Sequence, residues 1–218
     1  KAVIDQRSIK TVEEVEQIES ALDITYEIHH LAMKMSQPGP SEREGVGALM
    51  GIVKASGASP AFRFIFSVDG QILHNPHHQN VMQDGDIIIN DSGVETSMHY
   101  ASDITRTFPV AGKFTQKQKE IYAVVLDAQL KAIEIIQPGM EYRKVHNLAC
   151  CQITAGLMAL GLMRGDVNEA VAAGAHALFM PAGLGHMMGL DVHDMEDLGE
   201  DYVGYTNTIR RSSQFGMS

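Results

Sequence analysis

The sequence predicts an α+β fold in which helices cover a mostly antiparallel sheet. Segments with helical apolar spacing and helix-capping boxes lie at the beginning and in the second half of the chain. Segments rich in β-forming residues and bounded by turn dipeptides lie between them. No internal repeat or low-complexity linker divides the 218 residues, of which 44% are apolar. A chain of this length and composition is expected to bury one large core or two modest ones.

Two helices are predicted before residue 60. The first begins at a capping box formed by Thr11 and Glu14 and runs to about residue 34, before a Pro-Gly-Pro sequence. The second begins at the capping box of Ser41 and Glu44 and ends at Gly57. The first helix carries apolar residues at helical spacing, namely Val15, Ile18, Leu22 and Tyr26.

Strand signals follow the second helix. Residues 62–68 and 72–74 are predicted as two strands joined by a hairpin turn at Asp69-Gly70. Residues 86–91 follow the Asp84-Gly85 turn and form a run typical of a buried strand. A further strand is expected from residue 100 to about residue 110.

Two helices are predicted in the second half. The first begins at the Thr115–Gln118 capping pair and ends before Pro138-Gly139. The second covers about residues 142–162. The apolar positions of the first are Ile121, Val124, Val125, Leu130 and Ile133.

Charge and cysteine content exclude several classes of protein. The chain has 17 basic and 27 acidic side chains and a net charge of −10, so its mean field repels a polyanion and nucleic-acid binding is not expected. The only two cysteines, Cys150 and Cys151, are adjacent. This excludes a disulfide framework and a cysteine-rich zinc site, and it predicts a reducing compartment, the cytoplasm.

Residues 170–190 carry no formal charge and reach the length of a membrane span. Four glycines, Pro181 and the histidines His176 and His186 interrupt this run. We therefore predict that it forms buried irregular structure and that the protein has no membrane partner.

Two aspartates mark a candidate metal site. Asp91 ends one predicted strand, and Asp103 lies twelve positions later within the next. Two carboxylates on neighbouring strands repel each other unless a proton or a cation lies between them. The alternative, that Asp91 caps a turn while Asp103 pairs with Arg106, stays open at this point.

The second cluster is the glycine-rich segment from Gly183 to Asp194, in which His186 and His193 lie seven positions apart. Its glycines allow the backbone to pass close to another group. The alternative is that both histidines are hydrogen-bonded core residues. Several acidic residues follow His193, and most of them are interpreted as a solvated face: Asp194, Glu196, Asp197, Glu200 and Asp201.

Taken in order, three segments resemble the pita-bread metallopeptidases, the creatinase/methionine aminopeptidase superfamily. They are Asp91-Ser92-Gly93, Ser102-Asp103-Ile104-Thr105-Arg106-Thr107-Phe108-Pro109-Val110, and the pair Gly183-Leu184-Gly185-His186 and Asp191-Val192-His193-Asp194. The sequences of these segments are most similar to the proline-peptidase branch of the superfamily, Xaa-Pro aminopeptidase and prolidase. The resemblance covers nearly the whole chain and also includes Gly112-Lys113-Phe114-Thr115 and Arg7-Ser8-Ile9-Lys10.

The resemblance implies a role for each site residue. Asp91 would chelate one metal, Asp103 would bridge two, and His186 would ligate the second. His193 and His74 would contact the substrate and the developing tetrahedral intermediate. The implied cofactors are two divalent ions, with manganese the usual family metal, placed ~4 Å apart to activate water and polarise the scissile carbonyl.

Three departures from the family pattern affect these expectations. The aspartates are twelve positions apart instead of the usual eleven, and Ala182 stands where many proline peptidases have a histidine. The family supplies two further glutamate ligands on strands beyond the equivalent of His193, and the 218 residues contain no such motif. Residues 1–218 are therefore expected to be an incomplete pita-bread catalytic domain that lacks its C-terminal strands and the N-terminal domain of the parent protein.

The resemblance implies a metal-dependent exopeptidase that hydrolyses the bond between an N-terminal residue and proline, with the 218-residue fragment itself inactive. The expected partners are a small peptide with proline at its second position and a second copy in a homodimer. One alternative is a pita-bread binding module without catalysis, against which the retained Asp91, Asp103, His186 and His193 argue. The other is a different enzyme of the fold, such as a creatinase-type amidinohydrolase or a methionine aminopeptidase.

Overall fold

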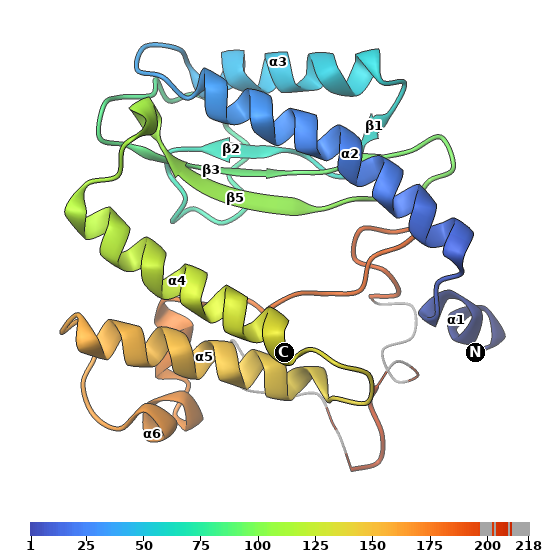
Figure 1. The fold of residues 1–218 in the computed structure, drawn as a ribbon, viewed down its shortest axis with the longest axis vertical. Helices are drawn as coiled ribbons and strands as arrows, with labels where there is room; N and C mark the ends of the chain where they lie inside the picture. The colour runs from blue at the N-terminus through green and yellow to red at the C-terminus, as the bar shows by residue number, and fades with distance from the viewer. Residues whose placement is uncertain (197–201, 203, 209, 211–218) are drawn as a thin grey trace. The chain divides into compact units, whose positions relative to one another are not determined.

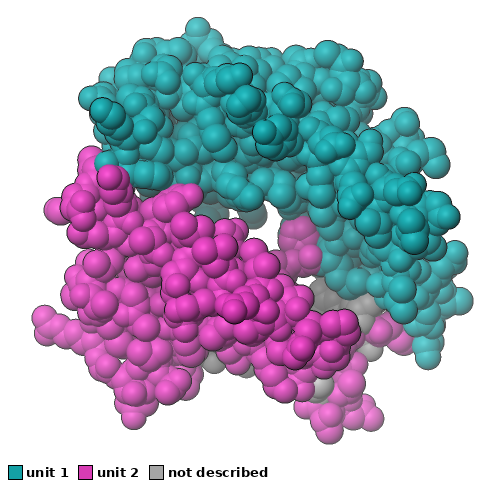
Figure 2. Space-filling model, viewed as in Figure 1, with its two compact units in different colours: residues 1–114, 187–199 teal, residues 115–186, 200–218 magenta. Residues whose placement is uncertain are grey.

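The computed structural model describes residues 1–196, 202, 204–208 and 210. The chain forms two compact units, which Figure 2 shows in different colours. Unit 1 comprises residues 1–114 and 187–199, and unit 2 comprises residues 115–186 and 200–218.

Three helices begin unit 1: α1 (Ala2–Ser8), α2 (Val12–Met35) and α3 (Glu42–Ala55). Helices α2 and α3 begin at the two predicted capping boxes, and both hydrogen bonds of each box are present. Helix α1 was not predicted. The prediction was correct for α2 and α3 because the capping signal is local to four residues.

The strands of unit 1 form two antiparallel sheets. In the larger sheet, β3 (Ile87–Ser92) lies between β2 (Ile65–Ser67) and β5 (Ile104–Pro109). The smaller sheet pairs β1 (Ser59–Pro60) with β4 (Val94–Glu95), and the short 3-10 helix η1 (Val110–Gly112) follows β5. Helices α2 and α3 pack on the larger sheet, as the α+β class requires (Figure 1).

The predicted hairpin at Asp69-Gly70 is wrong. Strand β2 ends at Ser67, and residues 72–74 form turns instead of a returning strand. Buried Asn75 donates to Ser67 Oγ at 3.1 Å, and Asn80 donates to carboxylate oxygens of Glu42 and Asp69 at 3.1 and 2.9 Å. These hydrogen bonds hold residues 68–80 as a loop.

The fourth predicted strand, expected from residue 100, begins at Ile104 instead.

The core of unit 1 lies between the larger sheet and the two long helices. Its buried apolar residues include Ile28, Leu49, Phe66 and Ile88, each fully inaccessible. In α2 the buried face consists of Ala21, Thr25, Ile28, His29 and Ala32. From the predicted apolar stripe, Val15 and Tyr26 are exposed.

Unit 2 is helical in its described part. It contains α4 (Gln116–Ile135), α5 (Tyr142–Ala159), α6 (Val167–Ala172) and the 3-10 helix η2 (Ala175–Leu178). The Thr115 capping box is present. Helices α4 and α5 pack side by side, and a Cβ built at Gly156 of α5 would lie 2.5 Å from a methyl carbon of Val124 (Figure 1).

Residues 170–190 contain the end of α6, helix η2 and irregular backbone. Among the described residues, no helix combines the length and the apolar character that crossing a membrane requires. The segment is irregular, as predicted, but only part of it is buried. Val171, His176 and Ala177 are buried, whereas Leu178 is 83% and Phe179 46% exposed.

Candidate metal centre

Strand β3 directs Asp91 away from helix α2. Side chains alternate along a strand, and the neighbours Asn90 and Ser92 are both buried against His29 of α2. His29 accepts from the Asn90 amide at 3.0 Å through Nδ1 and donates to the Ile104 carbonyl at 2.9 Å through Nε2. The buried network thereby fixes β3 against α2 and β5, and it leaves Asp91 on the opposite face.

The backbone after Asp91 passes very close to its neighbour. A Cβ at Gly93 would lie 1.8 Å from the carbonyl oxygen of Ser102, so only glycine fits there. Ser102 is bonded to Val94 through its backbone N–H, at 2.9 Å. This close approach brings the residue before Asp103 beside the end of β3.

Asp91 and Asp103 lie near enough for their charges to interact. Asp91 accepts a hydrogen bond from Thr105 Oγ1 at 2.7 Å. The pKa of Asp91 is raised to about 6: burial contributes most, the charge and the hydrogen bond of Asp103 add to it, and Thr105 and His74 act in the opposite direction. Part of this shift is thus the effect of a second carboxyl group close to Asp91.

The twelve-residue spacing is accommodated in the connection between β4 and β5. The backbone N–H of Thr96 donates to the Tyr100 carbonyl, and His99 adopts a left-handed backbone with φ of 65°. Asp91 pairs in register with Thr105, so both aspartates lie at the same end of the sheet at this spacing.

His74 lies in the loop after β2 and is exposed, with φ of 54°. Its charge lowers the pKa of Asp91, which places it in the electrostatic field of the aspartate pair. The neighbouring His77 is exposed, whereas the ring of His78 is bonded to the Phe64 carbonyl at 3.0 Å.

His193 lies in the segment that re-enters unit 1. One of its ring nitrogens lies within 4.8 Å of a carboxylate oxygen of Asp103. Its Nδ1 pairs with the Glu196 carboxylate, which orients the ring. The histidine and Asp103 are 90 positions apart in sequence, so only the fold brings them together.

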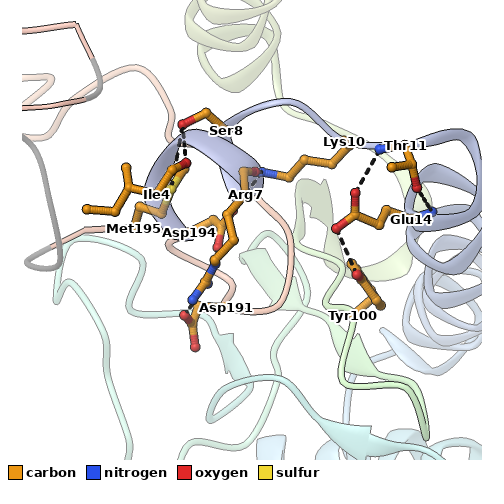
Figure 3. Close-up of polar contacts among 10 residues, drawn as sticks. All are labelled: Ile4, Arg7, Ser8, Lys10, Thr11, Glu14, Tyr100, Asp191, Asp194 and Met195. Atoms are coloured by element: carbon orange, nitrogen blue, oxygen red, sulfur yellow. Dashed lines mark hydrogen bonds and ion pairs between the residues drawn. The ribbon is translucent and has the colours of Figure 1, made fainter. Parts of the chain in front are cut away.

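A buried ion-pair cluster holds the His193 segment, and the sequence interpretation of Asp194 as solvated is wrong. The Asp194 side chain is 1% exposed and accepts from Arg7 at 2.5 Å and from Lys10 at 2.6 Å (Figure 3). Arg7 also binds the exposed Asp191 at 2.7 Å. The cationic residues come from α1 and the residues after it, so two segments more than 180 positions apart are joined.

Burial acts against ionisation of Asp194, but hydrogen bonds from Lys10 and Arg7 outweigh it and lower the pKa of its carboxyl group. Gly189 leaves room for this pairing, because a Cβ there would lie 2.7 Å from Asp194 Oδ2 and 2.9 Å from the Lys10 side chain. The signal that sequence reasoning missed was the Arg7–Lys10 segment, which opposes the acidic residues beside His193. Asp197, Glu200 and Asp201 lie outside the described residues.

His186 is the last residue before the chain returns to unit 1. The next residue, Met187, accepts from the Asp194 backbone N–H at 2.9 Å, and Gly189 accepts from the Ala101 N–H at 2.9 Å. These hydrogen bonds fix the segment after His186 beside Ala101, two positions before Asp103. Ala182, four positions before His186, is exposed.

The donors assembled in unit 1 suit a divalent cation. Carboxylate oxygens with imidazole nitrogen match the preferences of manganese and zinc. An ion between Asp91 and Asp103 would remove the repulsion that raises the Asp91 pKa. The arrangement can therefore hold a metal at one end of an antiparallel sheet, with His74 and His193 beside it.

This fold and donor set are compatible with the class of metallopeptidases. The profile of metallopeptidase family M24 matches residues 16–215, and the chain belongs to that family.

Curated relatives are named Xaa-Pro aminopeptidase. That of Escherichia coli K12 is 38% identical over 202 residues, which are 91% of this chain and 46% of the relative. That of Haemophilus influenzae is also 38% identical, over 90% of this chain and 46% of the relative. The chain thus spans about half the length of the curated relatives it matches.

Solved structures give the same result. A variant of E. coli aminopeptidase P in complex with substrate matches with a TM-score of 0.86 and 38% identity, over 92% of this chain and 46% of that one. Proline aminopeptidase P II from Yersinia pestis matches with a TM-score of 0.86 and 36% identity, over the same shares. Another match is described as Zn-substituted E. coli aminopeptidase P in complex with product. The expected α+β pita-bread fold is confirmed by these matches.

Proposed function

We propose that the whole protein is a metal-dependent aminopeptidase that releases an N-terminal residue preceding proline. The approach of Asp91, in β3, to Asp103, directly before β5, in a chain of family M24, carries this proposal. The names of the relatives support the proline specificity. The binding-module alternative does not account for two opposed carboxylates with histidines beside them.

Asp91, Asp103 and His186 are the proposed metal ligands, and two manganese ions are the proposed cofactors. The ions would supply Lewis acidity that activates water and polarises the scissile carbonyl. The oxygen-rich donor set agrees with manganese. For the 218 residues alone we expect weak metal binding and no turnover, because three protein ligands would serve two ions.

His193 and His74 are the proposed substrate-contacting residues. The Glu196 carboxylate pairs with Nδ1 of His193 and so fixes the orientation of the imidazole. The other ring nitrogen, Nε2, would then contact the substrate. A hydrogen bond from a fixed imidazole to the developing oxyanion is favourable because no reorganisation is needed. The Arg7–Asp194–Lys10 cluster holds Asp194, the residue that directly follows His193, and so acts through His193. A small peptide substrate, a homodimer and a cytoplasmic location complete the proposal.

The metal ligands are tested in the whole protein with paired peptides that differ in having proline or alanine at the second position. We expect cleavage of the proline peptide alone, loss of activity with a chelator and recovery with manganese. Asp103→Asn should abolish both metal binding and activity, whereas Asp127→Asn, on the exposed face of α4, should change neither. Equal cleavage of the two peptides would contradict the specificity, and an active Asp103→Asn variant would contradict the metal site.

The role of His193 is tested by metal content and turnover measured on the same samples. His193→Ala should lower turnover by about 10²–10⁴-fold and keep the metal, because we assign His193 to the substrate. His30→Ala, an exposed histidine of α2, is the control and should be fully active. Loss of metal in His193→Ala would show that His193 is a metal ligand.

A further inference from the structure

Unit 2 contains a buried cluster of two histidines and a cysteine that the proposed peptide cleavage does not use. His146 and Cys150 lie one turn apart on the same face of α5. His176 comes from η2, which packs against α5. All three side chains are buried, and one ligand atom from each lies within 4.8 Å of those of the other two.

The distances suit coordination by one ion. Cys150 Sγ lies 3.3 Å from His146 Nε2. Sulfur and nitrogen on a tetrahedral zinc ion lie about 3.6 Å apart, given bonds of about 2.3 and 2.0 Å. The His146 and His176 rings meet edge-on, with centroids 6.4 Å apart. Side-chain rotations that move the donor atoms by about an ångström would bring all three to bonding distance from one ion.

We propose that His146, Cys150 and His176 bind a zinc-class divalent transition-metal ion within unit 2. One thiolate and two imidazoles prefer zinc or cobalt, whereas manganese prefers oxygen ligands such as Asp91 and Asp103. The three donors leave a fourth tetrahedral position for water. This proposal is independent of the proposed peptidase activity, because it rests on other residues and another donor set.

A thiol–imidazole hydrogen bond is the competing explanation. It accounts for the pair on α5, where the Cys150 thiol and His146 Nε2 are in contact. It does not account for a third buried ligand side chain that arrives from a separate element. On binding, the Cys150 S–H bond would break, its proton would pass to the solvent, and a bond from Sγ to the metal would form.

A metal here would join η2 to α5. Among the described residues, the apolar core cluster of unit 2 has three buried members, Ala132, Val145 and Ala149, with three partly buried residues packed against them: Ile135, Met140 and Leu184. So small a core stabilises a unit weakly, and an ion bound to the folded state adds its binding free energy to stability. The site would thus have a structural role.

The test is titration of the metal-stripped protein with Co²⁺, followed by absorption spectroscopy. Sulfur-to-cobalt charge-transfer absorption in the near ultraviolet reports a thiolate ligand, which the Asp91–Asp103 site lacks. We expect this band in the unmodified protein and in Asp103→Asn. Cys150→Ser and His176→Gln should lose or strongly weaken it, whereas Cys151→Ser, which changes the adjacent cysteine, should retain it.

A second measurement covers the case in which Cys150→Ser does not fold. In Cys151→Ser, Cys150 is the only thiol left among the 218 residues, and the alkylation rate of Cys150 itself is measured with and without Zn²⁺. We expect Zn²⁺ to slow alkylation by about tenfold or more, because the reagent attacks the metal-free thiol. Absence of the cobalt band in the unmodified protein, or alkylation unaffected by Zn²⁺, would overturn the proposal. An aminopeptidase that is active without the band would leave the proposed function intact while refuting this site.

Discussion

The two units differ in how their residues are held in place. In unit 1, twelve apolar residues of one cluster are buried around Phe66 and Ile88, and polar side chains such as His29 and Asp194 are buried with partners. In the described part of unit 2 the corresponding cluster has three residues, and α4 exposes a series of large apolar side chains: Ile121, Tyr122, Val125, Leu126, Leu130 and Ile133.

The difference indicates that the two units respond unequally to substitution. Stability in unit 1 is supplied by packing and by satisfied buried polar groups, both of which are sensitive to single changes. Unit 2 has less packing to lose. Its response should depend on the His146–Cys150–His176 cluster and on whatever contacts the exposed face of α4.

The largest expected effect is in the core of unit 1. Phe66 is fully buried and lies against Gly45 of α3, so Phe66→Ala should destabilise unit 1 by about 3–5 kcal/mol. The matched control is Phe179→Ala, at a position 46% exposed, which should cost about 0.5 kcal/mol or less. Hydrogen exchange read peptide by peptide should show lost protection in α2, α3 and β3. Equal losses for the two variants would contradict the contrast between the units.

The next effect is at the ion-pair cluster. Asp194→Asn removes a buried carboxylate that accepts from Arg7 and Lys10, and it should cost about 1.5–3 kcal/mol. The cluster's contribution is present above the ordinary aspartate pKa and is lost as pH falls through the lower pKa of the folded state. Denaturant unfolding at several pH values measures this. Asp191→Asn, 57% exposed, is the control, and a loss as large as that of Asp194→Asn would refute the role of burial.

The aspartate pair gives a smaller effect that appears in metal binding. The pKa of Asp91 is raised to about 6, so a proton competes with the metal below that pH. Affinity for manganese should fall about tenfold, or ~1.4 kcal/mol, per pH unit below 6 and level off above it.

The Cys150 site should respond differently to pH. Burial raises the pKa of the Cys150 thiol to about 11, so the affinity of this site for zinc should keep rising with pH. Calorimetric titration with manganese and with zinc from pH 5 to about pH 8 compares how affinity depends on pH at the two sites. An identical pH dependence for both metals would be evidence against separate sites.

The smallest effect is on the exposed face of α4. Leu130→Ala, at a position 57% exposed, should change the free energy of unfolding by no more than about 0.5 kcal/mol. Ala128, on the same helix and 2% exposed, supplies the contrast, since Ala128→Leu should be clearly destabilising through overpacking. Thermal unfolding of the two variants measures both effects. A loss above about 2 kcal/mol for Leu130→Ala would mean that this face is covered in the protein.

Local signals were the predictable part of this fold. The capping boxes at Thr11, Ser41 and Thr115 set helix starts because their hydrogen bonds join residues three positions apart. The strand at residues 86–91 was predicted to within one residue because its apolar run is bounded by a turn. The candidate site was found through Asp91, Asp103, His186 and His193 as ordered motifs, whereas their assembly is a matter of the fold.

The errors have long-range causes. The predicted hairpin at Asp69-Gly70 failed because Asn80 donates to Glu42, 38 positions earlier in the chain, a hydrogen bond that no local pattern reveals. The apolar stripe of α2 was misplaced because the sheet packs against Ala21, Ile28 and Ala32, and small residues weigh little in a pattern of hydrophobicity.

By itself, the sequence determined the starts of the three helices with capping boxes, the central strand and the α+β class, and it offered Asp91, Asp103 and His186 as candidate metal ligands. These depend on interactions within a few residues or on residue chemistry. Only the tertiary structure decided that Asp194 is buried between Arg7 and Lys10, that Asp103 faces His193, and that His176 joins His146 and Cys150. Each of these contacts closes a loop of many residues, and its free energy depends on the packing of everything between.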